Sequence, residues 1–172
     1  MSSISTRPEH VSSDELVRAR RFRRLGIGIL AAVVVAGLFN VLGIRREVVT
    51  AEEDGYRLEV EYARVTRPGL ASSWVVAVTH PGGFEDPLTI TTNADYFDRF
   101  DFNQFYPEPS TTASRGDLLL LTFEGIEGER FVLRFDGRAS PLFVLDLAEA
   151  STGLEVAGRE IARVDYTTVV MP

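Results

Sequence analysis

The sequence predicts a single N-terminal transmembrane helix followed by an all-β, antiparallel, immunoglobulin-like β-sandwich. Two observations predict this fold class. Residues 25–44 carry no charge, and a helix of that length spans about 30 Å, which is the thickness of a bilayer's hydrocarbon core. From residue 56 onward, short apolar or alternating segments are separated by glycine and proline, and no helical run is long enough for a crossover.

The flanks of residues 25–44 predict its orientation. A helix should begin near Ser12, because residues 12–15 fit a capping box. More arginines precede the apolar stretch than follow it, and the arginine-rich side normally stays in the cytoplasm. Those that precede it closely are Arg18, Arg20, Arg21, Arg23 and Arg24. We therefore expect a basic cytoplasmic tail (residues 1–24), a cell-membrane span (residues 25–44) and an extracytoplasmic domain (residues 45–172).

A cleaved signal peptide is the alternative to this uncleaved signal anchor. Val34, Val35 and Ala36 follow a short apolar core and resemble a cleavage site. The apolar run continues to Ile44, however, and the positive region lies far from the start of the chain. Both features favour an anchor that stays attached.

A stripe of small residues marks one side of the predicted span. Gly28, Ala32, Ala36 and Asn40 recur every four residues. Small side chains allow a second helix to approach closely, and an amide in hydrocarbon gains from a partner. The stripe predicts helix association, with a second copy of the chain or with a larger integral membrane protein. Alanine and glycine are also common in spans that have no such partner, so this interpretation stays open.

The strands of the predicted domain are read from hydrophobic periodicity. Residues 56–62 alternate between apolar and charged side chains, which is typical of a strand with one buried face. Residues 73–79 are apolar on both faces and predict a central strand. Further strands are predicted at residues 88–92, 117–124, 129–136, 142–147 and 160–170, with an edge piece at residues 153–156. A small barrel is the alternative architecture.

Composition excludes several classes of function. Residues 1–24 carry six arginines and three acidic residues, whereas residues 45–172 carry twelve arginines and 22 acidic residues. An acidic domain repels phosphate, so no nucleic-acid partner is expected. The chain has no cysteine, which excludes disulfides, thiolate nucleophiles and cysteine-ligated metals. We expect no cofactor, and the exclusive use of arginine as the basic residue favours a bacterial source.

Catalytic and metal-ligating residues are sparse. His80 is the one histidine of the predicted domain, no Gly-x-Ser-x-Gly motif is present, and a turn residue is the better interpretation of His80. Acidic residues are numerous enough to meet by chance, which leaves an envelope hydrolase that uses carboxylates as an alternative function. Asp95, Asp98 and Asp101 are weak candidates for a calcium site, and they support a cation- or ligand-sensing module as a further alternative.

The segment from residue 95 to residue 106 is rich in aromatic side chains. One helical turn is expected at residues 95–100. The rings either fill one end of the sandwich or stay partly exposed as a docking patch. The candidate interface residues are Tyr96, Phe97, Phe100, Phe102 and Phe105, followed by Tyr106. The sequence thus predicts a non-enzymatic, single-pass protein of the bacterial envelope. Its β-sandwich would act as an interaction or accessory module for another membrane or envelope component.

Overall fold

The computed structural model describes residues 13–38, 44–142 and 145–171. The chain divides into two compact units, one ending at Gly43 and the other running from Ile44 to Pro172. We call the second the β unit. Each unit is described by itself.

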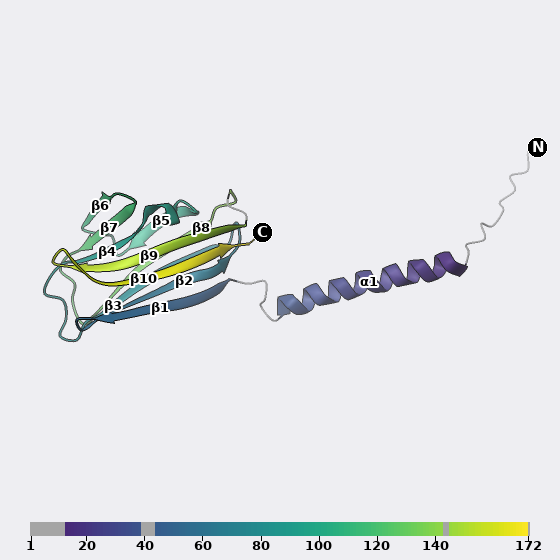
Figure 1. Ribbon diagram of the computed structural model, residues 1–172, viewed down its shortest axis with the longest axis horizontal. Helices are drawn as coiled ribbons and strands as arrows, with labels where there is room; N and C mark the ends of the chain where they lie inside the picture. Colours follow the sequence, from purple (N-terminus) through teal and green to yellow (C-terminus); the bar gives the residue numbers. More distant parts are fainter. Residues whose placement is uncertain (1–12, 39–43, 143–144, 172) are drawn as a thin grey trace, which may run out of the picture. The chain divides into compact units, whose positions relative to one another are not determined.

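The first unit contains one helix, α1 (Ser13–Leu38), drawn in purple to blue in Figure 1. It begins close to the predicted start. Residues 39–43 of the predicted span lie outside the described residues, and Ile44 is not helical. In the ranges that the structure describes, no helix is both long enough and apolar enough to cross a membrane.

The β unit is predominantly β-sheet and holds one short helix. Its elements are β1 (Arg45–Glu53), β2 (Tyr56–Thr66), β3 (Ala71–Thr79), β4 (Leu88–Asn93), α2 (Ala94–Phe97), β5 (Phe100–Tyr106), β6 (Thr111–Arg115), β7 (Leu118–Phe123), β8 (Arg130–Ala139), β9 (Asp146–Val156) and β10 (Arg159–Val170).

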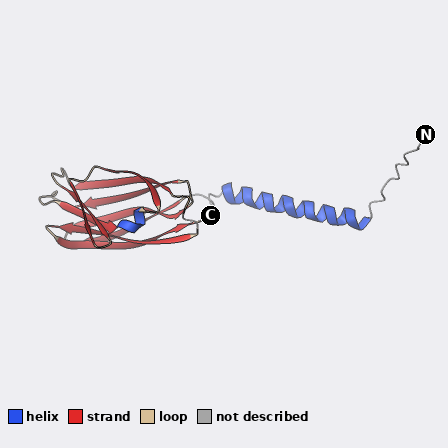
Figure 2. Cartoon of the chain, turned by 90° about the horizontal axis from the view of Figure 1, so that it is seen from above, coloured by secondary structure: helices blue, strands red, loops and turns tan. Residues whose placement is uncertain are grey.

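The strands form one curled sheet with two halves, as Figures 1 and 2 show. One half has the order β5-β8-β3-β2, with β1 also paired to β2, and the other has the order β10-β9-β4-β7-β6. Neighbouring strands pair antiparallel, apart from β2 and β10, whose parallel ladder joins Val65 to Val169 and Thr66 to Val170. This short ladder connects the two halves. The prediction of a predominantly antiparallel, sandwich-like β domain is confirmed.

The core lies between the two halves. Strand β2 buries Leu58, Val60 and Tyr62, at alternate positions, as the sequence pattern requires. Trp74 of β3 donates a hydrogen bond from Nε1 to the hydroxyl of Tyr166 on β10, at 2.8 Å. Because β3 and β10 belong to different halves, this bond crosses the core and holds the halves face to face.

Several predicted strand boundaries are wrong. Strands β1 and β6 were not predicted at all. In the predicted strand at residues 142–147, Leu142 is in a turn and Leu145 is in a bend, residues 143–144 lie outside the described residues, and β9 starts only at Asp146. Leu145 has a positive φ of 57°, which a regular strand does not allow. Residues 153–156 are no edge piece, because β9 lies between β10 and β4.

The β unit has two ends that differ in their loops. One end, which we call the Arg45 end, contains the start of β1, the β2–β3 turn (residues 67–70), the β8–β9 loop (residues 140–145) and the end of β10. Hydrogen bonds tie these parts together, from Gly69 N to Ala139 O at 2.7 Å and from Met171 N to Thr66 O at 2.9 Å. The opposite end, the Gly55 end, contains the loops at residues 54–55, 80–87, 107–110, 124–129 and 157–158.

Candidate functional site

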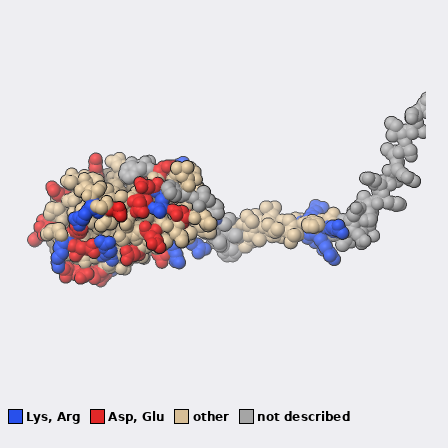
Figure 3. Space-filling view, turned by 45° about the horizontal axis from the view of Figure 1, so that its top comes forward, with Lys and Arg blue, Asp and Glu red and all other residues tan. Residues whose placement is uncertain are grey.

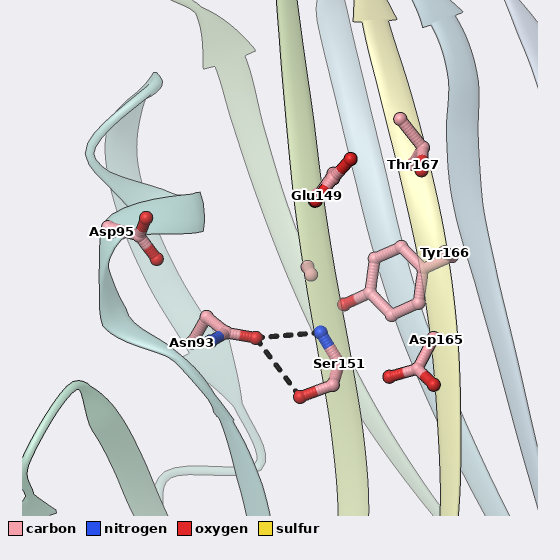
Figure 4. A pocket seen from close by; sticks show the side chains of 8 residues that line it. Asn93, Asp95, Glu149, Ser151, Asp165, Tyr166 and Thr167 are labelled. Atoms are coloured by element: carbon pink, nitrogen blue, oxygen red, sulfur yellow. Dashed lines mark hydrogen bonds between the residues drawn. The ribbon is translucent and has the colours of Figure 1, made fainter.

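A polar depression lies on the outer face of β9 and β10, beside α2 (Figure 4). Its volume is about 570 Å³, and we call it the β9–β10 depression. The residues that line it are Asn93, Asp95, Glu149, Ala150, Ser151, Asp165, Tyr166 and Thr167. They come from the end of β4, from α2 and from the β9–β10 hairpin, so the fold brings together segments far apart in sequence.

Strand alternation explains why polar side chains face the depression. On β9, Ala148 and Ala150 are buried while Glu149 between them is exposed. On β10, Val164 and Tyr166 are buried while Asp165 between them is exposed. Successive side chains of a strand point to opposite faces, so the residues that fill the core force their neighbours outward.

One wall of the depression is fixed by hydrogen bonds. The Oδ1 atom of Asn93 accepts bonds from the backbone N–H of Ser151 at 2.7 Å and from its hydroxyl at 3.1 Å, as Figure 4 shows. A guanidinium N–H of Arg163 also donates to the Ser151 hydroxyl at 3.3 Å. The end of β4 is thereby held against β9, which places α2 and Asp95 at the rim.

The depression is negatively charged. Asp95, Glu149 and Asp165 are exposed, and none of the lining residues is basic. Carboxylates gathered in a concave surface raise the local concentration of cations. The arrangement therefore suits a basic side chain or an amine more than an anion. Asp95 already lies 3.8 Å from Arg99, which shows that an arginine can reach this rim.

The calcium candidates do not form a metal centre in the described part of the chain. Asp95, Asp98 and Asp101 are all exposed. Over the described ranges, no group of three or more His, Asp or Glu side chains is placed to hold a metal ion. The nearest cation to Asp95 and Asp146 is instead Arg99, whose Nε donates to Asp146 at 2.7 Å.

The aromatic segment fills the core, and the prediction of an exposed docking patch is wrong for four of its rings. Tyr96, Phe97, Phe100 and Phe105 are each at most 7% exposed. The physical reason is the short helix α2, which turns Tyr96 and Phe97 inward. Phe97 then packs edge to face against Trp74, with ring centroids 5.3 Å apart. The Phe102 side chain lies outside the described residues, and Tyr106 is 76% exposed.

The buried tyrosines form a polar network inside this aromatic core. The Tyr166 hydroxyl contacts the hydroxyl of Thr152 at 3.0 Å, and the Tyr96 hydroxyl contacts that of Thr168 at 2.9 Å. Burial raises the pKa of both tyrosines above the ordinary value near 10. Both phenols therefore stay neutral at physiological pH and act as structural hydrogen-bonding groups.

His80 is a turn residue, as the sequence indicates. Its ring stacks on Tyr56 with centroids 4.0 Å apart and an interplanar angle of 6°. Its Nδ1 lies 3.1 Å from the carbonyl oxygen of Gly55. These contacts fasten the β1–β2 turn to the β3–β4 loop, which is a structural task.

The residues predicted on the helix are exposed where they are described. Arg18, Arg20, Arg21, Arg23 and Arg24 gather on one stretch of α1, drawn in blue in Figure 3. Gly28 and Ala32 are exposed, the side chain of Ala36 is not described, and Asn40 lies outside the described residues.

Sequence reasoning missed Asn93, Glu149 and Asp165. The available signal was the turn at Ala157 and Gly158, which makes a hairpin of β9 and β10 and pairs Asp165 with Ser151. Once that register is known, alternation places Glu149 and Asp165 on the outer face. Asn93 joins the lining of the depression because β4 pairs with β9, and the local sequence does not specify that pairing.

Comparison with known proteins gives weak structural likenesses. No protein-family model matches the chain, and no curated protein matches it. Among solved structures, it is similar to the CARDB domain of a Pyrococcus furiosus protein in complex with di-metal ions (TM-score 0.41, 11% identity, covering 72% of this chain and 93% of that one).

Two further solved structures match a smaller part of their own length. One is a DUF4466 family protein from Parabacteroides merdae (TM-score 0.37, 11% identity, 72% of this chain and 42% of that one). The other is an inactive mutant of the GH20 exo-β-N-acetylglucosaminidase from Vibrio harveyi (TM-score 0.28, 17% identity, 74% of this chain and 18% of that one). With TM-scores below 0.5, these likenesses carry no argument about function.

Proposed function

We propose that this chain is a non-enzymatic, single-pass membrane-anchored protein of the bacterial envelope, with a cytoplasmic N-terminus. Its extracytoplasmic β unit binds another membrane or envelope protein as an accessory module. The proposed span is the sequence stretch of residues 25–44 as a whole, which includes the undescribed residues 39–43.

The observation that carries the anchor is the surface of α1. Apolar side chains are exposed on every side of the helix; they are Leu25, Ile27, Ile29, Leu30, Val33, Val34 and Val35, at 49–65% exposure. A helix that buries one stripe against a protein core shows a polar opposite face. An apolar surface all round, preceded by exposed arginines, is the pattern of a helix surrounded by lipid with its basic end at the headgroups.

The recognition surface that we propose is the β9–β10 depression. Tyr96, Phe97, Phe100 and Phe105 are used in the core. The fold instead gathers the exposed carboxylates of Asp95, Glu149 and Asp165 in one depression. They fit a basic segment of a protein partner. We also propose that the sandwich is immunoglobulin-like, which is supported by its two facing halves and by the buried Trp74 on an interior strand.

Membrane extraction tests the anchor. Full-length protein in isolated membranes should resist extraction with alkaline carbonate, and Val33→Arg combined with Ile29→Arg should release it, because two buried arginines make insertion unfavourable. Arg21→Lys serves as the matched control, since it changes a predicted headgroup residue without changing its charge. Release of the wild-type chain by carbonate alone would refute the anchor.

Affinity capture from gently solubilised membranes, read by mass spectrometry, tests the accessory role. A stoichiometric membrane partner is expected with the tagged wild-type chain. If the span mediates binding, the partner is lost when Gly28, Ala32 and Ala36 are changed to leucine. If the depression mediates it, the partner is lost with Glu149→Gln plus Asp165→Asn, and Glu127→Gln at the Gly55 end has no effect. A wild-type chain that captures no partner would contradict the accessory role.

A further inference from the structure

We propose that the Arg45 end of the β unit is a lipid-contacting surface, on which exposed leucines of the β8–β9 loop insert into the headgroup region of an anionic bilayer. This inference rests on the proposed membrane anchor and adds a second, independent point of contact with the same membrane.

The leucines of this end are unusually exposed. Leu142 is 86% exposed, Leu145 is 78% exposed and Leu147, at the start of β9, is 64% exposed. Leu70 and Met171, from neighbouring parts of the same end, are 38% and 39% exposed. Elsewhere in the described β unit, large apolar side chains that are exposed occur singly, at Val48 and Tyr106. Single exposed apolar residues are normal, whereas several at one end of a domain indicate a binding surface.

The loop holds its leucines outward by fixed contacts. Asp146 follows the loop directly and is bound by Arg99, which anchors the start of β9. The backbone N–H of Leu142 lies 3.4 Å from the hydroxyl of Ser140, which accepts its hydrogen bond. Leu145 adopts φ of 57°, a left-handed conformation that is costly for a leucine. Residues 143 and 144 lie outside the described residues and carry no part of this argument.

The charge distribution favours a lipid surface as the occupant. The Arg45 end carries Arg45, Arg46, Arg64 and Arg67, of which Arg46 and Arg64 form ion pairs with Glu61 and Glu47. It also carries Asp101 at the start of β5 and Asp146 at the start of β9, so its charges are mixed. The Gly55 end is acidic. Its loops carry the exposed residues Asp54, Glu85, Asp86, Glu108, Glu124, Glu127 and Glu129, and the exposed Glu53 ends β1 beside them. An anionic membrane surface repels the acidic Gly55 end more strongly than the mixed Arg45 end, which favours an orientation with the leucines toward lipid.

The covalent structure places the same end near the anchor. The chain enters the β unit at Ile44 and begins β1 at Arg45, so it joins this unit at the end that carries the leucines. Residues 39–43 extend at most about 20 Å even when fully stretched. The proposed anchor is therefore joined by a short connection to the end of the β unit that carries the leucines.

Site-specific fluorescence tests the proposal on the full-length chain. The protein has no cysteine, so single cysteines can be introduced and labelled with an environment-sensitive fluorophore without background. Three labelled variants are reconstituted in vesicles of phosphatidylcholine and phosphatidylglycerol that contain nitroxide-labelled lipid. Leu145→Cys probes the loop, Val34→Cys probes the helix, and Glu127→Cys is the matched control at the Gly55 end.

We expect the fluorophore at position 145 to emit at shorter wavelength and to be quenched several-fold more strongly than the one at position 127. If the fluorophore at position 34 is quenched while the one at position 145 is quenched no more than the control at position 127, this inference is overturned and the anchor is left intact. No quenching at position 34 would instead overturn the anchor. A blue shift at position 145 without lipid quenching would show that protein covers the loop, which also overturns the proposal.

A second variant separates lipid contact from folding. With the label at Leu147→Cys, the additional changes Leu142→Asn and Leu145→Asn should abolish the quenching. Asparagine tolerates the left-handed backbone at position 145, so the thermal unfolding midpoint should not fall. Persistence of the quenching in this variant would contradict the assignment to these leucines.

Discussion

Replacing Tyr166 by phenylalanine removes the hydroxyl at the centre of the buried network and keeps the ring. Trp74 Nε1 loses its acceptor at 2.8 Å and the Thr152 hydroxyl loses its partner at 3.0 Å. Trp74 is 2% exposed and Thr152 is fully buried, so water cannot replace the lost bonds. Each unsatisfied buried group costs about 1–3 kcal/mol, so with two such groups we expect the free energy of unfolding to fall by about 2–6 kcal/mol.

Tyr96→Phe is the matched control for this change. The Tyr96 hydroxyl contacts one hydroxyl, that of Thr168 at 2.9 Å, and its ring lies in the same aromatic core. Its loss should therefore cost about 1–3 kcal/mol. The ratio of the two losses in free energy of unfolding tests whether the Tyr166 hydroxyl connects the two halves of the sheet or whether Tyr166 only fills space in the core.

Urea unfolding of the full-length chain in mild detergent measures both costs. Trp74 is the sole tryptophan of the chain and lies in the core, so its fluorescence follows the β unit alone. Linear extrapolation gives the free energy of unfolding of each variant. Equal losses below about 1 kcal/mol for Tyr166→Phe and Tyr96→Phe would refute the reasoning, because they would show that neither hydroxyl satisfies a group that is costly to leave unpaired.

Three further predictions concern the β unit and are read by the same urea assay. Burial raises the pKa of Tyr96, so above pH 10 the unfolded state loses this phenol proton before the folded state does, and the free energy of unfolding falls by about 1.4 kcal/mol per pH unit. Tyr96→Phe should therefore make the fall of stability above pH 10 shallower, and an unchanged slope would contradict the role of Tyr96. Arg115→Ala removes the guanidinium bound at 2.8 Å to the buried Glu155 and should lower the free energy of unfolding by about 1–3 kcal/mol. Adding Glu155→Gln should restore part of this stability, and no recovery would assign the loss to packing. Gly153→Ala would place a Cβ 2.6 Å from Thr91 Oγ1 and should lower the free energy of unfolding by about 1–3 kcal/mol. If Gly153→Ala costs the same in a chain that also carries Thr91→Ala, the clash with Thr91 is refuted.

The strands that the sequence predicts well are those with one clearly buried face. In β2, Tyr56–Thr66, the alternation of apolar and charged residues matches the buried positions. Strand β6 had no such signal, because all five of its residues are exposed and it pairs with β7 at the end of the sheet. Strand β1 was not predicted, because its two arginines resemble the flank of a span and its last two residues, Glu52 and Glu53, resemble a linker.

The aromatic segment shows why local pattern could not decide the site. The density of rings at residues 96–105 fits a core plug and a docking patch equally well. The choice depends on α2, which the sequence predicts as one helical turn at residues 95–100. No local pattern reveals that this turn directs Tyr96 and Phe97 against β3 and β10. Of the three carboxylates of the β9–β10 depression, the sequence singled out Asp95 alone, as a calcium candidate, and gave no sign that Glu149 and Asp165 lie beside it. Their proximity follows from strand register, which is a long-range property.

The distribution of charge over the β unit is visible in the structure but not along the sequence. Along the sequence, arginines and acidic residues of the β unit are interspersed, and the total indicates only an acidic domain. The antiparallel strands return the chain repeatedly to the same two ends, which collects the acidic turns at the Gly55 end. Residues 45 and 67 are 22 positions apart, yet they belong to one end because β1 and β2 form a hairpin. The Gly55 end is therefore more acidic than the Arg45 end, where arginines and carboxylates are mixed. Under the proposed anchoring, an anionic membrane would repel the Gly55 end more strongly, which net charge alone does not indicate.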